Sequence, residues 1–245
     1  MRKILIANWK MNPLSEREAT KLARLSDFSG VVIAPPFPFL AAVGKSVKSA
    51  ALGAQDVFFE KEGPYTGEVS PGMIKKLGVK YVIVGHSERR AAGESDDVIA
   101  KKAGAALAAG LKVVLCVGES RSVREKGISE SKAFVRKQIF SVLKRAQKSI
   151  REKPQNLIVA YEPVWAIGSG KPALPEDASV MSDHIVSSFR KKFLKAPEVL
   201  YGGSVDARNA RYFLEKKSLR GLLVGGASLD GKEFAKIAEV SKKFN

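Results

Sequence analysis

Short apolar runs alternate with longer amphipathic stretches along the whole chain. Eight such runs can be recognised: Ile4–Ala7, Val31–Ala34, Ala50–Gly53, Tyr81–Val84, Val113–Val117, Leu157–Tyr161, Val199–Tyr201 and Leu222–Val224. None alternates cleanly between apolar and polar residues, which is typical of strands buried on both faces of a parallel sheet. Successive runs lie about 31 residues apart, the size of one strand-plus-helix unit. The pattern therefore predicts eight β-α units.

The segments between the runs carry helix-start signals. Ser15 and Glu18 form a capping box, in which each side chain bonds to the other residue's backbone N–H, and Ser129 begins a weaker version of the same pattern. Pro71 and Pro175 stand where prolines of a first helical turn belong. These signals predict that helices follow the apolar runs.

Eight units in 245 residues, without a linker or a break in composition, fit one closed barrel. We therefore expect an α/β protein in which residues 1–245 form a single (β/α)₈ TIM barrel. An open, doubly wound parallel sheet remains the alternative, because periodicity alone does not distinguish the two. In barrels the active site lies on the loops that follow the carboxyl ends of the strands.

Those strand ends carry specific polar residues. Lys10, His86 and Glu162 follow runs one, four and six, and glycine-rich segments follow runs seven and eight. A carboxylate beside an imidazole and a lysine suits proton abstraction next to a carbonyl, because the cation and the imidazole stabilise the developing oxyanion. Glycines that expose backbone N–H groups suit phosphate. We expect no metal and no cofactor, since two histidines and one cysteine form none of the usual metal-binding patterns.

Two segments resemble nucleotide-binding motifs but lack features that those motifs require. Gly168-Ser169-Gly170-Lys171 resembles the end of a P-loop, but its first glycine would fall on Trp165 and Pro172 replaces the required Ser or Thr. The same glycines with Ala173 match a dinucleotide fingerprint, yet no strand directly precedes them. We set both aside.

Several segments together resemble the triosephosphate isomerases, from the first strand to the last helix. They are Asn8–Asn12, Ala54-Gln55, Tyr65–Glu68, Gly85–Arg90, Cys116–Glu119, Tyr161–Lys171, Tyr201–Val205 and Leu223–Leu229. The resemblance implies an isomerase that interconverts dihydroxyacetone phosphate and D-glyceraldehyde 3-phosphate through an enediol(ate), in glycolysis and gluconeogenesis.

The resemblance also implies a role for each strand-end residue. Glu162 is then the base, His86 the electrophile, and Lys10 the cation that stabilises the enediolate and helps Asn8 to bind substrate. The implied main-chain contacts to the substrate phosphate come from Gly168, Ser204, Gly225 and Gly226. Glu88 corresponds to a buried carboxylate near the lysine.

Two regions depart from the family pattern. The lid that the resemblance implies, residues 163–173, has Ser169 and Pro172 where threonine is expected at both positions. Asp56 stands where Asn is usual in the loop 55–68, through which the resemblance implies a homodimer. These departures concern the motion of the lid and the tightness of the dimer rather than the reaction.

Other functions fit the residues less well. A sugar-phosphate aldolase or epimerase is a second phosphate-handling barrel, but an aldolase needs a Schiff-base lysine on an inner strand position, and the runs offer none except near Lys10. A non-catalytic basic binding protein should have lost part of the catalytic set, which is complete here. His184 lies among polar residues of a helical segment and is expected to face solvent, whereas Trp165 fits either a lid anchor or a surface packing role.

The charge balance raises the question of a nucleic-acid partner. The chain has 42 Lys and Arg against 25 Asp and Glu, a net charge of +17. The basic pairs are scattered: Lys75-Lys76, Lys101-Lys102, Lys191-Lys192, Lys216-Lys217 and Lys242-Lys243. The densest basic stretch, 129–153, has the apolar periodicity of an amphipathic helix with a solvated face. From this distribution we expect no nucleic-acid partner.

The cysteine count and the length of the apolar runs indicate where in the cell the protein is located. Cys116 is the single cysteine, so an intrachain disulfide is excluded and a reducing compartment is favoured. No apolar run approaches the roughly 18 residues of a membrane span, and the first apolar run is too short for a signal peptide. We expect a cytoplasmic protein without membrane attachment.

Overall fold

Eight parallel strands form the centre of the computed structural model, which describes residues 2–168, 170–190 and 195–244, apart from the side chains of Arg145 and Gln147. The strands are β1 (Ile4–Asn8), β2 (Val31–Ala34), β3 (Ala51–Ala54), β4 (Tyr81–Val84), β5 (Lys112–Val117), β6 (Leu157–Tyr161), β7 (Glu198–Tyr201) and β8 (Gly221–Val224). Each contains one of the predicted apolar runs, apart from Ala50 at the start of the third.

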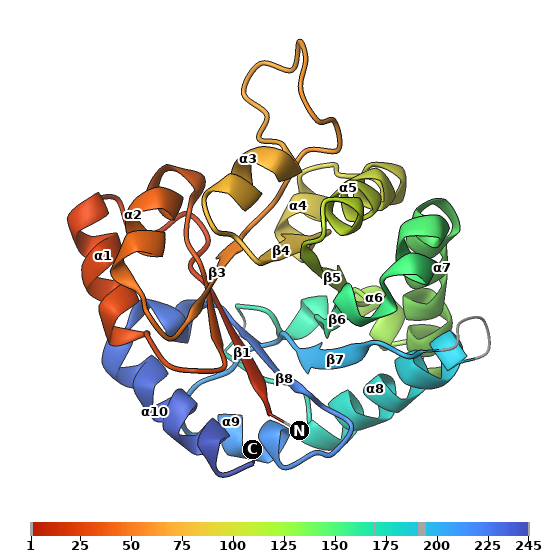
Figure 1. Cartoon of the computed structure of the whole chain (residues 1–245). Coiled ribbons are helices and arrows are strands. Elements are labelled where there is room, and N and C mark those ends of the chain that lie inside the picture. The colour runs from red at the N-terminus through yellow and green to blue at the C-terminus, as the bar shows by residue number, and fades with distance from the viewer. Residues whose placement is uncertain (1, 169, 191–194, 245) are drawn as a thin grey trace.

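The sheet closes on itself. Every strand pairs in parallel with its neighbour in the sequence, and β8 returns to β1 with Gly221 opposite Ile4. Because β1 pairs with both β2 and β8, the open-sheet alternative is excluded and the predicted (β/α)₈ barrel is confirmed. Figure 1 shows the helices as a ring around the strands.

The α-helices of this ring vary in length. They are α1 (Glu16–Leu25), α2 (Leu40–Ser46), α3 (Pro71–Lys76), α4 (Ser87–Ala91), α5 (Asp96–Ala108), α6 (Arg121–Arg124), α7 (Ile128–Glu152), α8 (Pro175–Arg190), α9 (Ala210–Leu214) and α10 (Gly231–Lys242). Short 3₁₀ turns occur at Phe37–Phe39, Pro154–Asn156, Val164–Ala166 and Gly226–Leu229. Within the described residues, no helix combines the length and apolar character that crossing a bilayer requires.

The core has two layers, which explains why the apolar runs are continuous. Side chains such as Ile6, Val32 and Cys116 fill the inside of the barrel. Their strand neighbours, such as Leu5 and Ala7, point outward and pack under the helices. Because successive strand residues point to opposite faces, both faces of each strand are buried and neither needs polar residues.

The helix-start signals are mostly confirmed. The Ser15 hydroxyl accepts a hydrogen bond from the Glu18 N–H and caps α1, and Pro71 and Pro175 are the first residues of α3 and α8. The weaker signal at Ser129 was wrong. Gly127, at φ 109°, precedes α7 and lets the chain turn into the helix, which begins at Ile128, one residue before Ser129.

Replacing Ser15 with alanine is expected to reduce the free energy of unfolding by about 1 kcal/mol, because the Glu18 N–H loses its partner. Urea denaturation measures the change. Ser120→Ala is the matched control: Ser120 precedes α6, but its hydroxyl bonds to the Ser122 hydroxyl and caps no backbone N–H of that helix. Equal losses in the two variants would contradict the capping argument.

The expectation for His184 was wrong. Its side chain is half-buried between α8 and α7, and its Nε2 lies 3.0 Å from the carbonyl oxygen of Lys132. The polar neighbours of His184 in the sequence gave no sign of this contact, because its partner lies on another helix.

Candidate active site

The carboxyl ends of the strands meet around a cavity of about 440 Å³. All eight site residues expected from the sequence line it: Asn8, Lys10, His86, Glu162, Gly168, Ser204, Gly225 and Gly226. They come from loops that follow β1, β4, β6, β7 and β8, together with Asn8, the last residue of β1. The barrel therefore brings into one mouth residues that are up to 218 positions apart in the sequence.

Glu162 and His86 face each other at the bottom of the cavity. Glu162 is 2% exposed and His86 7%, and Glu162 Oε1 lies 3.3 Å from His86 Nε2. The other carboxylate oxygen, Oε2, accepts a hydrogen bond of 3.0 Å from the backbone N–H of Ser87. The base candidate is thus oriented by a main-chain donor and shielded from water.

The protonation pattern of His86 follows from its position before α4. Its Nδ1 accepts a hydrogen bond of 3.2 Å from the backbone N–H of Glu88. A ring nitrogen that accepts carries no proton, so the neutral imidazole has its proton on Nε2. That N–H points toward Glu162 and the cavity, where it can donate to a substrate oxygen.

Lys10 has a backbone conformation rare for a residue with a side chain, with φ at 54°. Two side chains hold it there: Asn8 Oδ1 accepts from the Lys10 N–H at 3.1 Å, and Gln55 Nε2 donates to the Lys10 carbonyl at 2.8 Å. The left-handed region costs such a residue about 1–2 kcal/mol. This strain places the Lys10 ammonium at the mouth, where it pairs with Glu88.

Glu88 is less covered than the family resemblance implies. Its side chain is 54% exposed in the single chain. The expected burial of this carboxylate is therefore not seen in the isolated subunit.

One wall of the cavity offers backbone donors to an anion. Gly225 and Gly226 begin a 3₁₀ turn, and within the described part of the chain their N–H groups donate to no carbonyl. Ser204 lines the same cavity, with its hydroxyl bonded to the Ala166 carbonyl at 2.6 Å. Two unpaired N–H groups beside a hydroxyl suit the oxygens of a phosphate.

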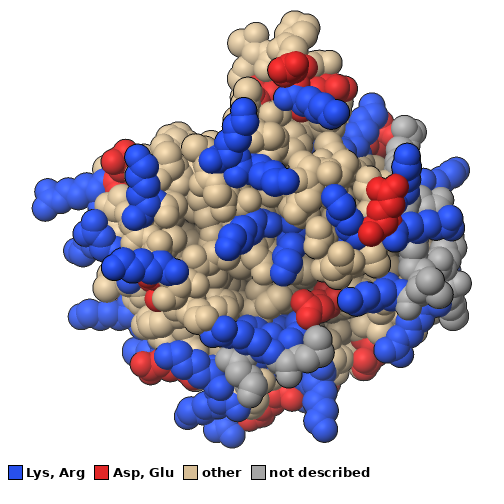
Figure 2. Space-filling view, in the orientation of Figure 1, with Lys and Arg blue, Asp and Glu red and all other residues tan. Residues whose placement is uncertain are grey.

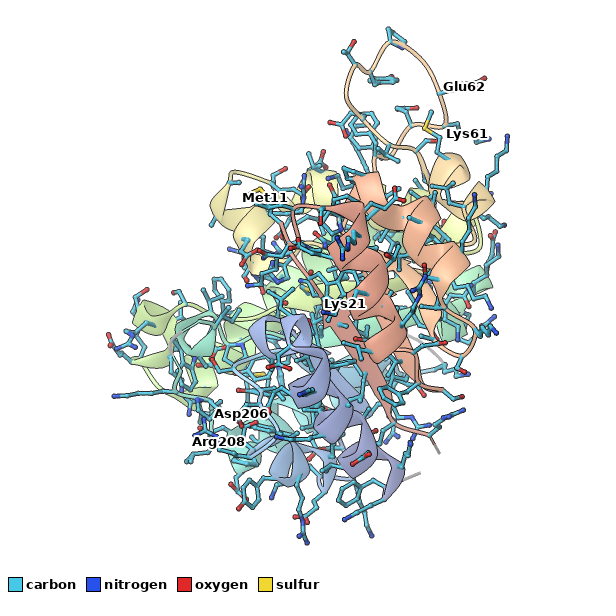
Figure 3. All side chains as sticks on the ribbon, turned by 90° about the vertical axis from the view of Figure 1, so that its left-hand side faces the viewer. Met11, Lys21, Lys61, Glu62, Asp206 and Arg208 are labelled. Carbon is cyan, nitrogen blue, oxygen red and sulfur yellow. The ribbon has the colours of Figure 1, made fainter. Side chains whose placement is uncertain are left out.

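A charged pair closes the outer edge of this wall. Arg208 and Asp206 line the cavity and are bonded to each other, with Arg208 Nε 2.9 Å from Asp206 Oδ2. This contact with Arg208 lowers the pKa of Asp206. Figure 3 shows both residues at the same end of the barrel as Met11.

The expected lid is anchored at both ends by buried groups. Trp165 Nε1 donates to Glu119 Oε1 at 2.9 Å, and the same oxygen accepts from the Tyr161 hydroxyl at 3.0 Å. At the other end, the Ala173 N–H donates to the Tyr201 hydroxyl at 3.0 Å. Trp165 is therefore an anchored residue at the base of the lid rather than a surface packing residue. Ser169 lies outside the described residues.

No role was predicted from the sequence for Glu119, Gly118 or Gly202. Glu119 is fully buried and joins the base of the lid to β6. A Cβ on Gly118 would lie 1.7 Å from the Glu162 carbonyl oxygen, and one on Gly202 would lie 2.9 Å from Glu162 Cγ. Both glycines are therefore needed for the backbone to pack against Glu162. The sequence signal for these residues was that they lie in Cys116–Glu119 and Tyr201–Val205, two of the segments that resemble the family.

Burial keeps three groups near the base protonated. It raises the pKa of Tyr201 to about 12 and that of Tyr161 far above its usual range, with the charge of Glu119 acting in the same direction. The Cys116 thiol lies inside the barrel, where burial and the nearby Glu162 raise its pKa. These groups therefore stay neutral near pH 7.

A buried ionic cluster lies at the base of loop 55–68. Lys102, 3% exposed, donates to both Asp56 oxygens at 2.9 and 2.8 Å and also bonds to Glu94. Arg89 contacts the same two carboxylates at 2.8 and 3.1 Å. Burial raises the pKa of Asp56, although Lys102 acts in the opposite direction. The cluster ties α5 to the segment that follows β3.

Comparison with known proteins agrees with this geometry. The sequence model of the protein family described as "Triosephosphate isomerase" matches residues 3–241. A triosephosphate isomerase from Carboxydothermus hydrogenoformans is 46% identical over 256 aligned residues, which cover 98% of this chain and 100% of the relative. Proteins of the same name from Aquifex aeolicus and Acidithiobacillus ferrooxidans are 42% and 41% identical, over 97% and 99% of this chain and 98% of each relative.

Proposed function

The chain belongs to the triosephosphate isomerase family, and from that premise we propose how its own residues carry the reaction. The protein interconverts dihydroxyacetone phosphate and D-glyceraldehyde 3-phosphate by proton abstraction through an enediol(ate), a step of glycolysis and gluconeogenesis. The observation that carries the assignment of roles is the meeting of Glu162, His86 and Lys10 beside a wall of free backbone donors.

Glu162 is the base that removes the proton next to the substrate carbonyl. Its carboxylate lies in a nearly dry position, where a charge interacts strongly with its neighbours. Returning the same proton to the adjacent carbon, while the hydroxyl proton passes from one substrate oxygen to the other, completes the isomerisation. One carboxylate therefore serves both proton transfers at carbon.

His86 and Lys10 stabilise the oxygen that becomes negative. The neutral His86 donates its Nε2 proton to that oxygen, and the Lys10 ammonium adds a positive charge at the mouth. Asn8 holds the Lys10 backbone and lines the same cavity, so it positions the cation as well as contacting substrate.

The phosphate binds at the glycine-rich wall, next to Lys10, whose Cε would lie 3.4 Å from a Cβ on Gly225. Gly225 and Gly226 supply free N–H groups, and Gly168 and Ser204 complete the ring of contacts. Because this wall binds through fixed dipoles, it needs no metal ion.

A coupled assay tests the activity. D-glyceraldehyde 3-phosphate is supplied, and a dehydrogenase that consumes dihydroxyacetone phosphate reports its appearance. Absence of turnover would reject the proposed roles. An aldolase would instead form a Schiff base at Lys10, which borohydride would trap in the presence of substrate; such trapping would favour that second phosphate-handling barrel.

We also propose that residues 1–245 act as one domain in the cytoplasm. The strands and helices of the barrel run from Ile4 to Lys242. Cys116 is buried as a free thiol, which suits a reducing compartment.

Loop 55–68 is proposed to join two copies of the chain into a homodimer. The loop projects away from the barrel, as Figures 1 and 3 show, and Phe58 stacks on Phe59 within it. Beside the active site lies a second cavity of about 290 Å³ lined by Met11 and Glu88, and the Met11 side chain is 86% exposed. The tip of a partner's loop, at Thr66, would cover these residues.

Sedimentation velocity is expected to show a dimer at micromolar concentration, with an affinity that rises with ionic strength. Both subunits carry a net charge of +17, so salt screens a repulsion between them. A fully active monomer at micromolar concentration would reject the proposal, as would an affinity that falls when salt is added.

Replacing Pro172 with threonine is expected to change lid opening and closing but not the chemical step. Pro172 fixes φ near −65° and restricts Lys171 before it, while Ala173 after it is held by Tyr201. The effect on kcat should stay within about tenfold, or ~1.4 kcal/mol. NMR relaxation dispersion at Trp165, together with the fraction of methylglyoxal released per turnover, measures it. Equal exchange rates in both proteins would make Pro172 a neutral difference.

A further inference from the structure

Folding gathers basic residues that are scattered along the sequence. In a (β/α)₈ barrel the helices run opposite to the strands, so the end of each helix and the loop to the next strand lie where the strands begin. Lys75-Lys76 and Lys242 end α3 and α10, and Lys216-Lys217 follow α9. Figure 2 shows this end of the barrel, with Lys and Arg side chains across its width and few Asp or Glu among them.

Some of these lysines serve the fold itself. Lys75 and Lys153 donate to the carbonyls of Ala109 and Ala108, at 2.5 and 3.3 Å, where α5 ends. A helix carries about half a negative charge at its C-terminus, which nearby ammonium groups offset. Lysines bonded in this way need no further explanation.

Six other basic residues on this end are exposed and, among the described residues, form no ion pair. They are Arg2, Lys45, Lys76, Lys80, Lys217 and Lys243, and we call them the basic face. Arg2, Lys80 and Lys217 lie outside any helix, so helix ends do not account for them.

Two acidic groups at the same end have partners, and a third, Glu152 at the end of α7, is exposed. Asp27 accepts hydrogen bonds from the backbone N–H groups of Lys48, Ser49 and Ala50. Glu198 pairs with Arg220 at 3.0 Å. The positive charge of the basic face is therefore left largely uncompensated.

Acidic residues occur in the first helical turns at the opposite end of the barrel, together with the basic residues of the cavity. The first turns of α1 and α5 there carry Glu16 and Glu18, and Asp96 and Asp97, whereas Glu176 in the first turn of α8 pairs with Lys216 at 2.6 Å. A long polyanion is consequently attracted to the basic face, which lies away from the active site. A bound polymer would leave the mouth open to substrate.

We propose that the basic face binds double-stranded nucleic acid through its phosphate backbone, without reading the base sequence. The linear distribution of basic pairs argued against such a partner. Three of the pairs, Lys75-Lys76, Lys216-Lys217 and Lys242-Lys243, nevertheless converge at one end of the fold, and this convergence reverses that expectation. Phosphates spaced along a duplex match separate ammonium groups spread over a broad face.

Two other polyanion classes fit less well. Proteins that hold single strands stack the bases on several aromatic side chains. Among the described residues, the exposed large aromatic side chains are Tyr65 on loop 55–68 and Tyr212 on α9, so at most Tyr212, near Lys217 in the chain, could serve the basic face. A firm hold on a bilayer requires inserted apolar groups as well as charge, and the exposed Leu77 beside Lys76 is a small anchor for that purpose.

Fluorescence anisotropy with a labelled duplex of mixed sequence tests the proposal. If four of the six residues contact phosphates, raising salt from about 50 to about 200 mM should weaken binding about 100-fold, from a slope of about −0.9 per contact. Adding a saturating amount of duplex should leave isomerase turnover unchanged, because the basic face lies opposite the active site.

Two charge-matched variants distinguish the face from net charge. The first carries Lys76→Glu, Lys80→Glu, Lys217→Glu and Lys243→Glu. The second carries Lys21→Glu, Lys126→Glu, Lys137→Glu and Lys144→Glu, all exposed positions without a described ion pair and outside the basic face. We expect the first variant to lose binding at low salt and the second to keep most of it, both with normal isomerase activity.

Several results would overturn the proposal: no binding by the unchanged protein at low salt, equal losses in the two variants, or stronger competition from anionic phospholipid vesicles than from duplex at equal phosphate. If the first variant loses isomerase activity through misfolding, the milder pair Lys80→Gln and Lys217→Gln replaces it. This pair should reduce the salt slope by about 1.8. An unchanged slope would reject the basic face.

Discussion

Replacing Glu162 with glutamine is expected to lower kcat by at least about 10²–10⁴-fold, the usual cost of losing a general base. The amide has nearly the same shape and its oxygen can still accept the Ser87 N–H, so the site should keep its geometry. It cannot, however, accept the substrate proton. Steady-state kinetics in both directions measure the loss.

The control for this variant is Asp206→Asn. Asp206 lines the same cavity but is bonded to Arg208 at the phosphate side, and its replacement should leave kcat within a few-fold. Binding of glycerol phosphate, which has the phosphate but no carbonyl, should be unchanged in Glu162→Gln. A nearly normal kcat in that variant would place the base elsewhere.

Replacing Lys102 with methionine is expected to reduce the free energy of unfolding by about 3–5 kcal/mol, because it leaves buried carboxylates without their central cation. Asp56 and Glu94 would then share Arg89, whose side chain is 45% exposed and partly screened by water. Urea denaturation measures the change, and activity at low urea reports whether the native fold persists.

The double variant Lys102→Met with Asp56→Asn separates charge from packing. Removing one carboxylate along with the cation restores neutrality, so the double variant should recover at least about 1 kcal/mol of the loss. Equal stability of the single and double variants would mean that lost packing explains the effect.

The loss should also depend on pH. Burial raises the pKa of Asp56, and a carboxyl group whose pKa is higher in the folded state stabilises the fold when protonated and less as pH rises through that pKa. The deficit of Lys102→Met should therefore shrink in acid, where Asp56 becomes neutral. A deficit that grows on acidification would contradict this account.

The sequence predicted the strands well because each is buried on both faces, and continuous apolar runs mark such strands. The polar Asn8 was left out of the first run, although its backbone pairs with Ala34 in the sheet. Composition does not reveal that pairing, because it depends on the neighbouring strand.

The site was predictable where chemistry follows a strand end in the chain, as with His86 and Glu162. Contacts between distant elements were not. Glu119 meets Tyr161 and Trp165 only because β5 and β6 are neighbours in the barrel. The predicted helix start at Ser129 was wrong for a related reason. The turn at Gly127 begins α7 earlier and overrides the local signal of the serine.

Closure of the barrel has a consequence for how the chain is made. β1 is the first strand to leave the ribosome, yet one of its two neighbours, β8, lies roughly 220 residues later. At about 5–20 residues per second, synthesis of that interval takes about 10–40 s. During that time any sheet already formed has two free edges, and free edges invite pairing with other chains. Pairing of β8 with β1 removes both free edges. It therefore ends the period in which a newly made chain is most exposed to aggregation.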